Sequence, residues 1–367
     1  MPRESGEVAD GALWSETEAP VPLLASRAES DVIAEPRING DRAAAGGIPD
    51  AQVRSEPSAA DFAAEQMLRT LASRPDSGWR LALFHLSAGH VRVAPSAAEL
   101  RHRELVARVK TPIRGCRKIA FISRKGGVGK TSTCLLAGHT FAAHRGDRVI
   151  ALDGNPDAGT LGHRVRRETT ETVTSLLAGA NEIERYADIR AYTSQAATRL
   201  EVVAADDDPQ ITQAIGEDEF KQAIRLLERH YNLVCLDTGT GVLESATRGI
   251  LDAADQVVVV IAPSLDGARA ASSTLDWLAE NSYRYLVESG VGVINGVRPY
   301  NGLVDLDRIE SHFAARCRTT VRIPWDSHLE TGAETVVEEL QAETRQAYLE
   351  LAAAVAVGFA DPPGRRS

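Results

Sequence analysis

The chain has 367 residues, with 41 Lys and Arg against 51 Asp and Glu, and a formal net charge of −10. Hydrophobic residues make up 43% of the chain and aromatic residues 5%, which suits a core built mainly from Ala, Val, Leu and Ile. This length exceeds one small domain and fits an α/β domain of about 250 residues with an appendage. The acidic balance argues against a protein whose whole surface is adapted to nucleic acid, although it leaves room for a local basic patch.

The cysteines and the apolar runs indicate the cellular compartment of the protein. Four cysteines lie far apart and form no Cys-x-x-Cys pair: Cys116, Cys134, Cys235 and Cys317. This spacing favours reduced thiols over a zinc site or a disulfide framework. The N-terminus lacks the pattern of a secretory signal, and the longest apolar runs, such as 257–262, suit buried strands rather than membrane spans. We therefore expect a cytoplasmic protein that contacts the inner face of a membrane at most peripherally, through a partner.

Residues 1–58 are rich in Ala, Glu, Ser, Pro and Gly and show little periodicity. Eleven acidic residues and five arginines within residues 1–60 give this region a net charge of −6. Such a composition cannot bury enough apolar surface to offset the entropy lost on ordering. The sequence therefore predicts a disordered acidic tail.

Residues 59–112 are predicted to form a helical extension. Apolar residues recur at helical spacing over 64–71 and 79–86. A third helix is predicted to open at Ser96, with capping-box spacing, and to stop before Pro112. Docking on the main domain is favoured over binding to a partner or to a membrane surface, because each apolar face is modest.

Residues 113–360 alternate short apolar runs with longer helical stretches, and residues 361–367 are predicted to be a flexible C-terminus. The continuous Val, Ile and Leu runs predict strands covered on both faces, in a doubly wound, mostly parallel α/β sheet with helices on both sides. The predicted strands are Lys118–Ser123, Arg148–Asp153, Leu200–Ala204, Leu233–Asp237, Gln256–Ala262, Gly290–Asn295 and Thr320–Ile323. The main predicted helices are Ser132–His144, Glu219–His230, Ala268–Asn281, Asp305–Ala315 and Leu340–Gly358.

The strongest motif is Lys-Gly-Gly-Val-Gly-Lys-Thr, which runs from Lys125 between a predicted strand and a predicted helix. The backbone N–H groups of such a loop, followed by a helix N-terminus, bind phosphates, and its glycines allow close approach of the anion. Lys130 is expected to bring a positive charge to the β- and γ-phosphates, and the Thr131 hydroxyl is expected to bind Mg²⁺. The predicted nucleotide contacts in this loop are Gly126, Gly127, Val128, Gly129, Lys130, Thr131 and Ser132.

The loop departs from the strict Walker A pattern, because Arg124 stands at its first position and a second lysine, Lys125, follows. It resembles the deviant Walker A motif of the MinD/ParA family, which belongs to the SIMIBI class of P-loop ATPases. The resemblance implies ATP and Mg²⁺ as cofactors and a homodimer that sandwiches the nucleotide. It also implies that Lys125 reaches the phosphates of the partner and couples ATP binding to dimerisation, as part of the catalytic set with Lys130.

The resemblance extends to the switch segments. Residues 233–241 resemble a Walker B strand followed by switch II, in which Asp237 would hold Mg²⁺ through water. In switch I the family commonly has Asp-x-Asp, and here Asp153 is followed by Asn155 in the second position. An amide cannot accept a proton from the attacking water, so either hydrolysis is slow or Asp157 takes the catalytic role. Asp153 is expected to belong to the magnesium shell.

The same resemblance places the nucleotide base. Asn295 would hydrogen-bond the adenine edge from a strand end, and the loop at Pro324 would pack against the base. Neither segment distinguishes ATP from GTP by its sequence alone.

Several further segments are similar to the EspI-like group of actinobacterial MinD-like ATPases associated with type VII (ESX) secretion. They cover residues 101–117, 153–161, 264–277, 304–313 and 323–329, and the overall resemblance spans about residues 75–360. It implies an ATPase switch that regulates or positions a secretion-system component or another protein partner.

Two alternatives stay open at this point. A ParA-like partitioning ATPase would bind DNA through the segment 101–125, which has nine basic residues against Glu104 and so a net charge of +8. For this segment a solvated or intramolecular face is favoured, and the acidic tail is a hypothetical cover for it. A nucleotide-binding scaffold with little turnover is the second alternative, because of Asn155. Membrane binding of the MinD type is disfavoured, since the last predicted helix has the pattern of a packing helix.

Overall fold

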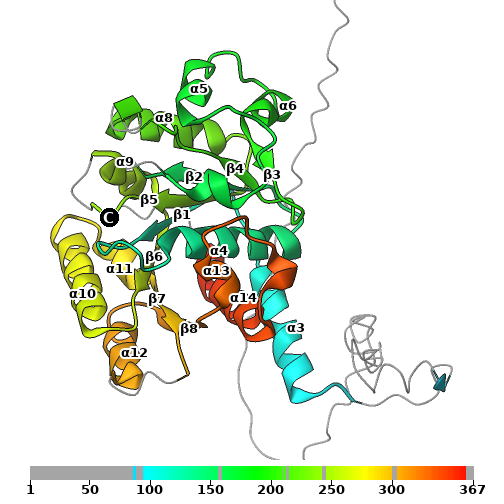
Figure 1. Cartoon of the computed structure of the whole chain (residues 1–367), viewed down its shortest axis with the longest axis vertical. Coiled ribbons are helices and arrows are strands. Elements are labelled where there is room, and N and C mark those ends of the chain that lie inside the picture. Colours follow the sequence, from blue (N-terminus) through cyan, green and yellow to red (C-terminus); the bar gives the residue numbers. More distant parts are fainter. Residues whose placement is uncertain are drawn as a thin grey trace, which may run out of the picture. The chain divides into compact units, whose positions relative to one another are not determined.

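The structure is a computed structural model that describes residues 86–87, 94–155, 159–208, 210–211, 215–241, 245–299 and 304–360. All of these residues belong to the second of two structural units, Thr70–Ser367, and Figure 1 labels their helices and strands. The predicted acidic tail, the first two predicted helices up to residue 85 and the predicted flexible C-terminus lie outside the described residues. Asp157 lies outside them as well.

An eight-stranded sheet forms the centre of this unit, in the order β3-β4-β2-β5-β1-β6-β7-β8. Every neighbouring pair is parallel except β3 with β4. The seven predicted strands are confirmed within a few residues, and only the two-residue strand β3 was not predicted. The strands are β1 (Arg117–Ile122), β2 (Val149–Gly154), β3 (Ser194–Gln195), β4 (Glu201–Val203), β5 (Leu233–Thr238), β6 (Gln256–Ile261), β7 (Val291–Val297) and β8 (Thr319–Pro324).

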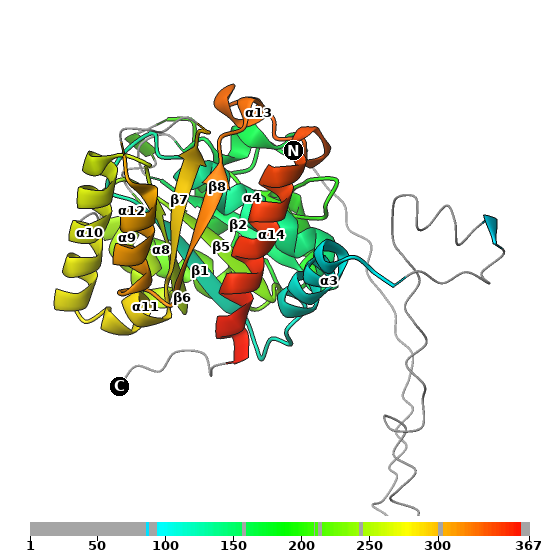
Figure 2. The same ribbon diagram turned by 90° about the horizontal axis from the view of Figure 1, so that it is seen from below.

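Helices cover both faces of the sheet, as the continuous apolar strands predict. In Figure 2, α3, α4 and α14 lie on one face, while α8, α9, α10, α11 and α12 lie on the other. Every residue of β2, β5 and β6 is buried between these layers. The helices are α3 (Ala97–Val109), α4 (Lys130–His144), α5 (Val173–Ala178), α6 (Tyr186–Ile189), α8 (Glu217–Leu227), α9 (Ser245–Ala253), α10 (Leu265–Glu280), α11 (Arg284–Ser289), α12 (Leu306–Ala314), α13 (Ser327–Glu330) and α14 (Ala342–Ala356).

The third predicted helix of the extension is present as α3 and packs against α4 and α14 on one face of the sheet. Its N-cap is Ser96, whose Oγ accepts the backbone N–H of Glu99 at 3.1 Å. Leu105 and Val109 are buried in the core cluster shared with α4 and α14. The buried Arg145, just after α4, donates to the carbonyl oxygens of Val109 and Thr111. These hydrogen bonds connect the C-terminal end of α3 to the end of α4.

The C-terminal helix α14 packs against the sheet, as its sequence pattern predicts. Leu351, Val355 and Ala356 are fully buried, and Arg101 of α3 pairs with Glu350 at 3.1 Å. Among the described residues, no helix combines the length and the hydropathy needed to cross a bilayer.

The register of the parallel strands sets the position of the site. Phe121 of β1 and Asp153 of β2 are both aligned with Asp237 of β5. Because carboxyl ends of parallel strands meet at one edge of a sheet, the loops that follow β1, β2 and β5 converge there.

Candidate functional site

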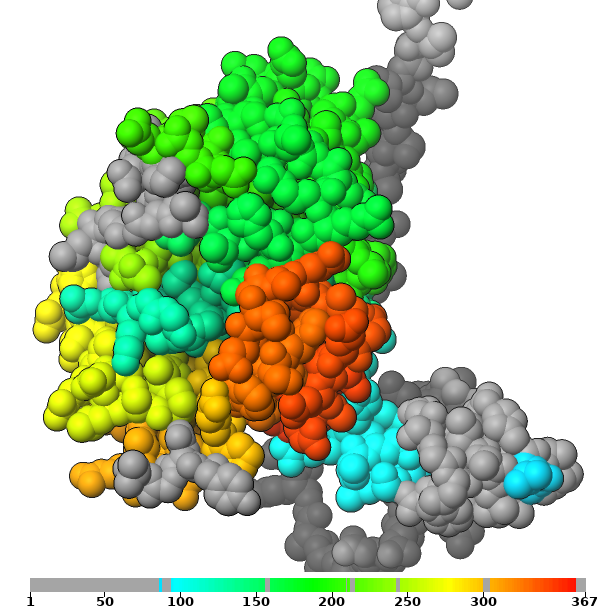
Figure 3. All heavy atoms as spheres, viewed as in Figure 1, coloured from blue at the N-terminus to red at the C-terminus, as the bar shows by residue number. Residues whose placement is uncertain are grey.

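The phosphate loop connects β1 to α4 and has the backbone conformation that its glycines allow. Gly127 and Gly129 adopt left-handed backbone angles, with φ of +72° and +83°. A Cβ at Gly129 would lie 2.2 Å from the Nδ2 of Asn295, so this position also needs the space that glycine leaves. The loop ends at the N-terminus of α4, where unpaired N–H groups favour an anion. In Figure 3 the teal loop reaches the surface between the green and yellow parts of the chain.

Lys130 links this loop to the end of β5. Its side chain is buried, and its Nζ donates to the Oδ1 of Asp237 at 3.2 Å and to the carbonyl oxygen of Thr238. The Thr238 hydroxyl donates in turn to the carbonyl of Phe121 at 3.0 Å, at the end of β1. The ammonium of Lys130 is therefore held by the last two residues of β5, within the segment 233–241 that resembles Walker B and switch II.

Two buried carboxylates, Asp153 and Asp237, lie on neighbouring strands beside Lys130. Asp153 accepts the backbone N–H groups of Leu161 at 2.9 Å and of Asn155 at 3.2 Å. Burial, together with the nearby charge of Asp237, raises the pKa of Asp153 well above its usual range. A cation placed between the two groups would remove this repulsion.

These residues fit the magnesium ion that the motif implies. The Oδ2 of Asp237 is buried and has no hydrogen-bond partner among the described residues, so one carboxylate oxygen is left to accept from a metal-bound water. Thr131 lies in the first turn of α4. The described residues contain no cluster of three or more His, Cys, Asp or Glu that would enclose a metal. Mg²⁺ is usually held by one or two carboxylates together with substrate phosphates, which matches the set Thr131, Asp153 and Asp237.

Lys125 precedes the glycines of the phosphate loop, and Asn155 lies beside Asp153 at the end of β2. The backbone N–H of Lys125 donates to the Oγ of Ser123 at 3.3 Å, and its ammonium has no hydrogen bond or ion pair within the described part of the chain. That leaves the Lys125 side chain available to a ligand or to a second copy. Asn155 follows β2 directly. Asp157 lies outside the described residues, so its expected catalytic role stays a prediction.

Asn295 has a structural contact that its sequence position does not reveal. Its Nδ2 donates to the carbonyl oxygen of Val128 at 2.8 Å, so the end of β7 holds the phosphate loop in place. The next residue, Gly296, has a φ of +74° and accompanies an irregularity in the pairing of β7 with β8. A contact of Asn295 with the base stays a prediction. Pro324 is the last residue of β8 and pairs with Val297 at the end of β7.

Comparison with known proteins agrees with this geometry. Residues 116–286 match the family model described as an AAA domain. The structure is similar to a ParA-family ATPase from Chlorobium tepidum TLS, with a TM-score of 0.54 and 18% identity over 65% of this chain and 98% of that chain. Over this region the chain is similar to MinD/ParA-like P-loop ATPases. Its fold also matches the septum site-determining protein MinD of Pyrococcus horikoshii OT3 complexed with Mg-ADP, with a TM-score of 0.50 and 16% identity over 65% of this chain and 94% of that chain.

A curated relative covers more of the sequence than the ATPase domain family does. The ESX-1 secretion-associated protein EspI of Mycobacterium tuberculosis is 37% identical over 291 residues, which is 79% of this chain and 43% of that protein. The chain thus spans less than half the length of this relative. The similarity to the EspI-like group expected from the sequence segments is confirmed.

The basic segment that leads into the ATPase domain is largely paired within the protein. Arg103 bonds Glu99 at 2.8 Å, and Lys118 lies 3.2 Å from Glu228. Arg117 is buried and donates to the carbonyl of Phe359 at 2.9 Å. Arg101 and Arg108 also have acidic partners, Glu350 and Glu104. Five of the nine basic residues counted along 101–125 therefore make intramolecular contacts.

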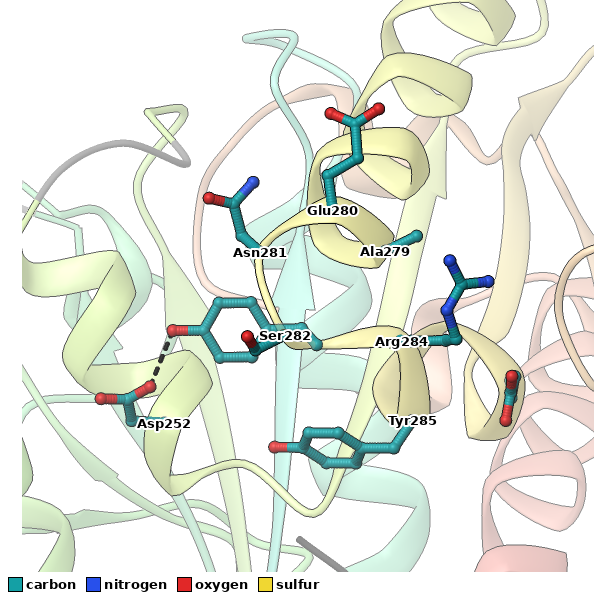
Figure 4. A pocket seen from close by; sticks show the side chains of 9 residues that line it. Asp252, Ala279, Glu280, Asn281, Ser282, Arg284 and Tyr285 are labelled. Carbon is teal, nitrogen blue, oxygen red and sulfur yellow. Dashed lines mark hydrogen bonds between the residues drawn. The ribbon is translucent and has the colours of Figure 1, made fainter. Parts of the chain in front are cut away.

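A separate hollow lies at the other edge of the sheet. It has a volume of about 650 Å³ and is bordered by the ends of α9 and α10 and by α11. The phenol of Tyr283 donates to the carboxylate of Asp252 at 2.7 Å, and Figure 4 marks the hydrogen bond that reaches Asp252 with a dashed line. Since α11 directly precedes β7, this hollow is at the amino ends of the strands. It is distinct from the nucleotide site, which lies at their carboxyl ends.

Proposed function

We propose that this chain is a Mg-ATP-binding switch that dimerises around the nucleotide, hydrolyses it slowly and regulates or positions protein partners at a type VII secretion system. The observation that carries the proposal is the position of Lys130 between the phosphate loop and the switch II residues Asp237 and Thr238. Lys130 can exchange its bond to the Thr238 carbonyl for a phosphate oxygen, because a charge-assisted bond to phosphate is the stronger of the two. Nucleotide binding would thereby release the switch II backbone.

The remaining residues support a slow, dimeric cycle. Magnesium bound beside Thr131, Asp153 and Asp237 would neutralise phosphate charge as it does in related nucleotide sites. Asn155 can hold a water molecule without accepting its proton, which favours slow turnover. Lys125, whose ammonium has no described partner, is the candidate for contact with the nucleotide of a second copy. The similarity to EspI supports an output at a secretion apparatus.

Three variants test the switch. We expect ATP-dependent dimers of the wild type in size-exclusion chromatography with ATP and Mg²⁺. Lys130→Ala should lose ATP binding, and Lys125→Ala should keep ATP binding but lose the dimer. Arg124→Ala is the matched control, because it removes the neighbouring exposed base and should leave the dimer intact. A wild type that stays monomeric with ATP and Mg²⁺ would refute the sandwich-dimer mechanism.

Two further measurements separate the proposed output from its rivals. Phosphate release by the wild type distinguishes a switch with turnover from a scaffold without it. A titration of DNA at several salt concentrations tests the partitioning alternative, for which affinity should fall steeply with salt. We expect measurable phosphate release and no ATP-dependent DNA binding.

A further inference from the structure

A half-buried arginine near Asp237 has no hydrogen-bond or ion-pair partner among the residues that the structure describes. Arg164 ends the short helix η2 (Leu161–Arg164), which follows switch I. Its Nε is shielded from solvent, and none of its guanidinium nitrogens has a hydrogen bond or ion pair among the described residues. Two other arginines near α4 are paired by contrast: Arg145 with Asp147 and two carbonyls, and Arg199 with the carbonyls of Ala142 and Arg145. Because arginines withdrawn from water are normally paired, the environment of Arg164 favours an anionic ligand.

The helix η2 begins against one of the two acids that are predicted to bind Mg²⁺. Leu161, at the start of η2, donates its N–H to Asp153 at 2.9 Å. A 3₁₀-helix rises about 2 Å per residue, so the Cα of Arg164 lies only about 6 Å farther along, within the length of an arginine side chain. The charge of Arg164 interacts with that of Asp237. The Oδ1 of Asp237 accepts from Lys130 and its Oδ2 from no described group, so Asp237 is a neighbour of Arg164 and not its hydrogen-bond partner.

The segment that follows Pro324 holds Arg164 from the other side. The carbonyl oxygen of Arg164 accepts the N–H of Thr335 at 2.9 Å. A Cβ at Gly332 would be 3.9 Å from a terminal guanidinium nitrogen, so this loop passes against the side chain. Asp326 fixes both ends of the segment, because it accepts N–H groups from His328 at 3.0 Å and from Gln341 at 2.9 Å. In Figure 1 this orange-to-red segment, with α13, lies across α4.

Taken together, the backbone of Arg164 is fixed between switch I and the loop after β8, while its guanidinium lies near Asp237 and has no partner among the described residues. We propose that Arg164 binds an anionic oxygen of the phosphate chain of the nucleotide held by its own chain. The guanidinium offers several N–H donors in a planar fork that suits phosphate oxygens. This inference rests on the proposed ATP binding and adds a residue that the phosphate-loop motif does not contain.

The test compares Arg164→Gln with Arg166→Gln in the full-length protein. Arg166 is exposed and lies two residues farther along the same segment, so it is the matched control. We would measure ATP and ADP affinity by isothermal titration calorimetry, once with Mg²⁺ and once with EDTA. Loss of a charge-assisted bond should weaken binding about tenfold or more in Arg164→Gln under both conditions, and less than about twofold in Arg166→Gln.

The melting temperature of the ligand-free protein separates binding from a structural role. Removing an unpaired charge should leave this temperature unchanged or raise it, while the increase caused by ATP becomes smaller. Equal nucleotide affinities of Arg164→Gln and wild type would overturn the inference. A loss seen only with Mg²⁺ would also overturn it, because Arg164 would then act through Asp237 and the metal. A wild type that binds no ATP would instead overturn the proposed function itself.

Discussion

Replacing Gly129 by alanine should damage the phosphate loop in two separable ways. The left-handed φ of +83° opposes any residue with a Cβ. The new Cβ would also lie 2.2 Å from the Nδ2 of Asn295, which at present donates to the carbonyl of Val128 at 2.8 Å. Gly127 separates the two effects, because it has a φ of +72° in the same loop and nothing lies within 4 Å of a Cβ placed there.

The expected magnitudes follow from these two contacts. The left-handed conformation should cost Gly127→Ala about 1–2 kcal/mol of unfolding free energy. Gly129→Ala should lose that amount and, because the amide is displaced, about 1 kcal/mol more for the hydrogen bond. Asn295→Ala should lose about 1 kcal/mol for the same hydrogen bond. The double variant Gly129→Ala/Asn295→Ala loses this bond only once, so its effect should fall short of the sum by about 1 kcal/mol.

Urea unfolding of the ligand-free protein measures all four variants, with an unchanged slope as the requirement for comparing midpoints. ATP affinity, measured in parallel, should fall for Gly129→Ala and recover in part in the double variant, where the clash is removed. The reasoning is refuted if the effects of Gly129→Ala and Asn295→Ala simply add. It is equally refuted if Gly129→Ala costs no more than Gly127→Ala.

Three other predictions concern the metal acid, a buried histidine and the extension. Asp237→Asn should remove the Mg²⁺-dependent part of the ATP affinity, while its ATP affinity in EDTA should stay within a few-fold of the wild-type value. If calorimetry finds the same Mg²⁺ dependence in both proteins, the predicted metal site is contradicted. Burial lowers the pKa of His139 to about 4 from 6.5, so the unfolded chain binds this proton first and stability falls as the pH drops from 6.5 to 4. The loss of unfolding free energy should total about 3 kcal/mol and should be absent in His139→Gln. Urea unfolding at several pH values measures it, and an equal dependence of stability on pH in both proteins would contradict the prediction. Arg145→Met should lose about 2–4 kcal/mol of unfolding free energy, because the carbonyls of Val109 and Thr111 lose their buried donor. The same variant should expose residues 97–112 to limited proteolysis. If it resisted protease as well as the wild type does, this role of Arg145 would be contradicted.

The fold and the phosphate loop could be predicted because their signals are local. Each strand of the parallel sheet is buried on both faces, so runs such as 256–262 are apolar without alternation. The loop from Lys125 to Thr131 is one contiguous motif whose glycines and lysines have fixed positions relative to a strand end and a helix start. Strand β3 has only two residues and pairs with β4 at the sheet edge, so it is too short for a sequence pattern to predict it.

The contacts that organise the site could not be predicted, because they join distant residues. Asn295 and Val128 are 167 positions apart, and Lys130 and Asp237 are 107 apart. The family resemblance predicts that Asn295 contacts the base, whereas its support of the phosphate loop is shown only by the packing of β7 against the loop after β1. Arg164 carried no sequence signal at all, since its surroundings come from β5, α14 and the segment after β8.

The net charge illustrates the same division. The sequence by itself determined that the chain is acidic overall, that residues 1–60 hold much of that charge, and that residues 101–125 are basic. Only the tertiary structure decided what the basic residues do: Arg101 meets Glu350, and Lys118 meets Glu228 and Asp255. Composition and motifs follow from residues that are neighbours in the chain. The pairing of charges depends on which helices and strand ends the topology brings together, and that is set by the packing of the whole sheet.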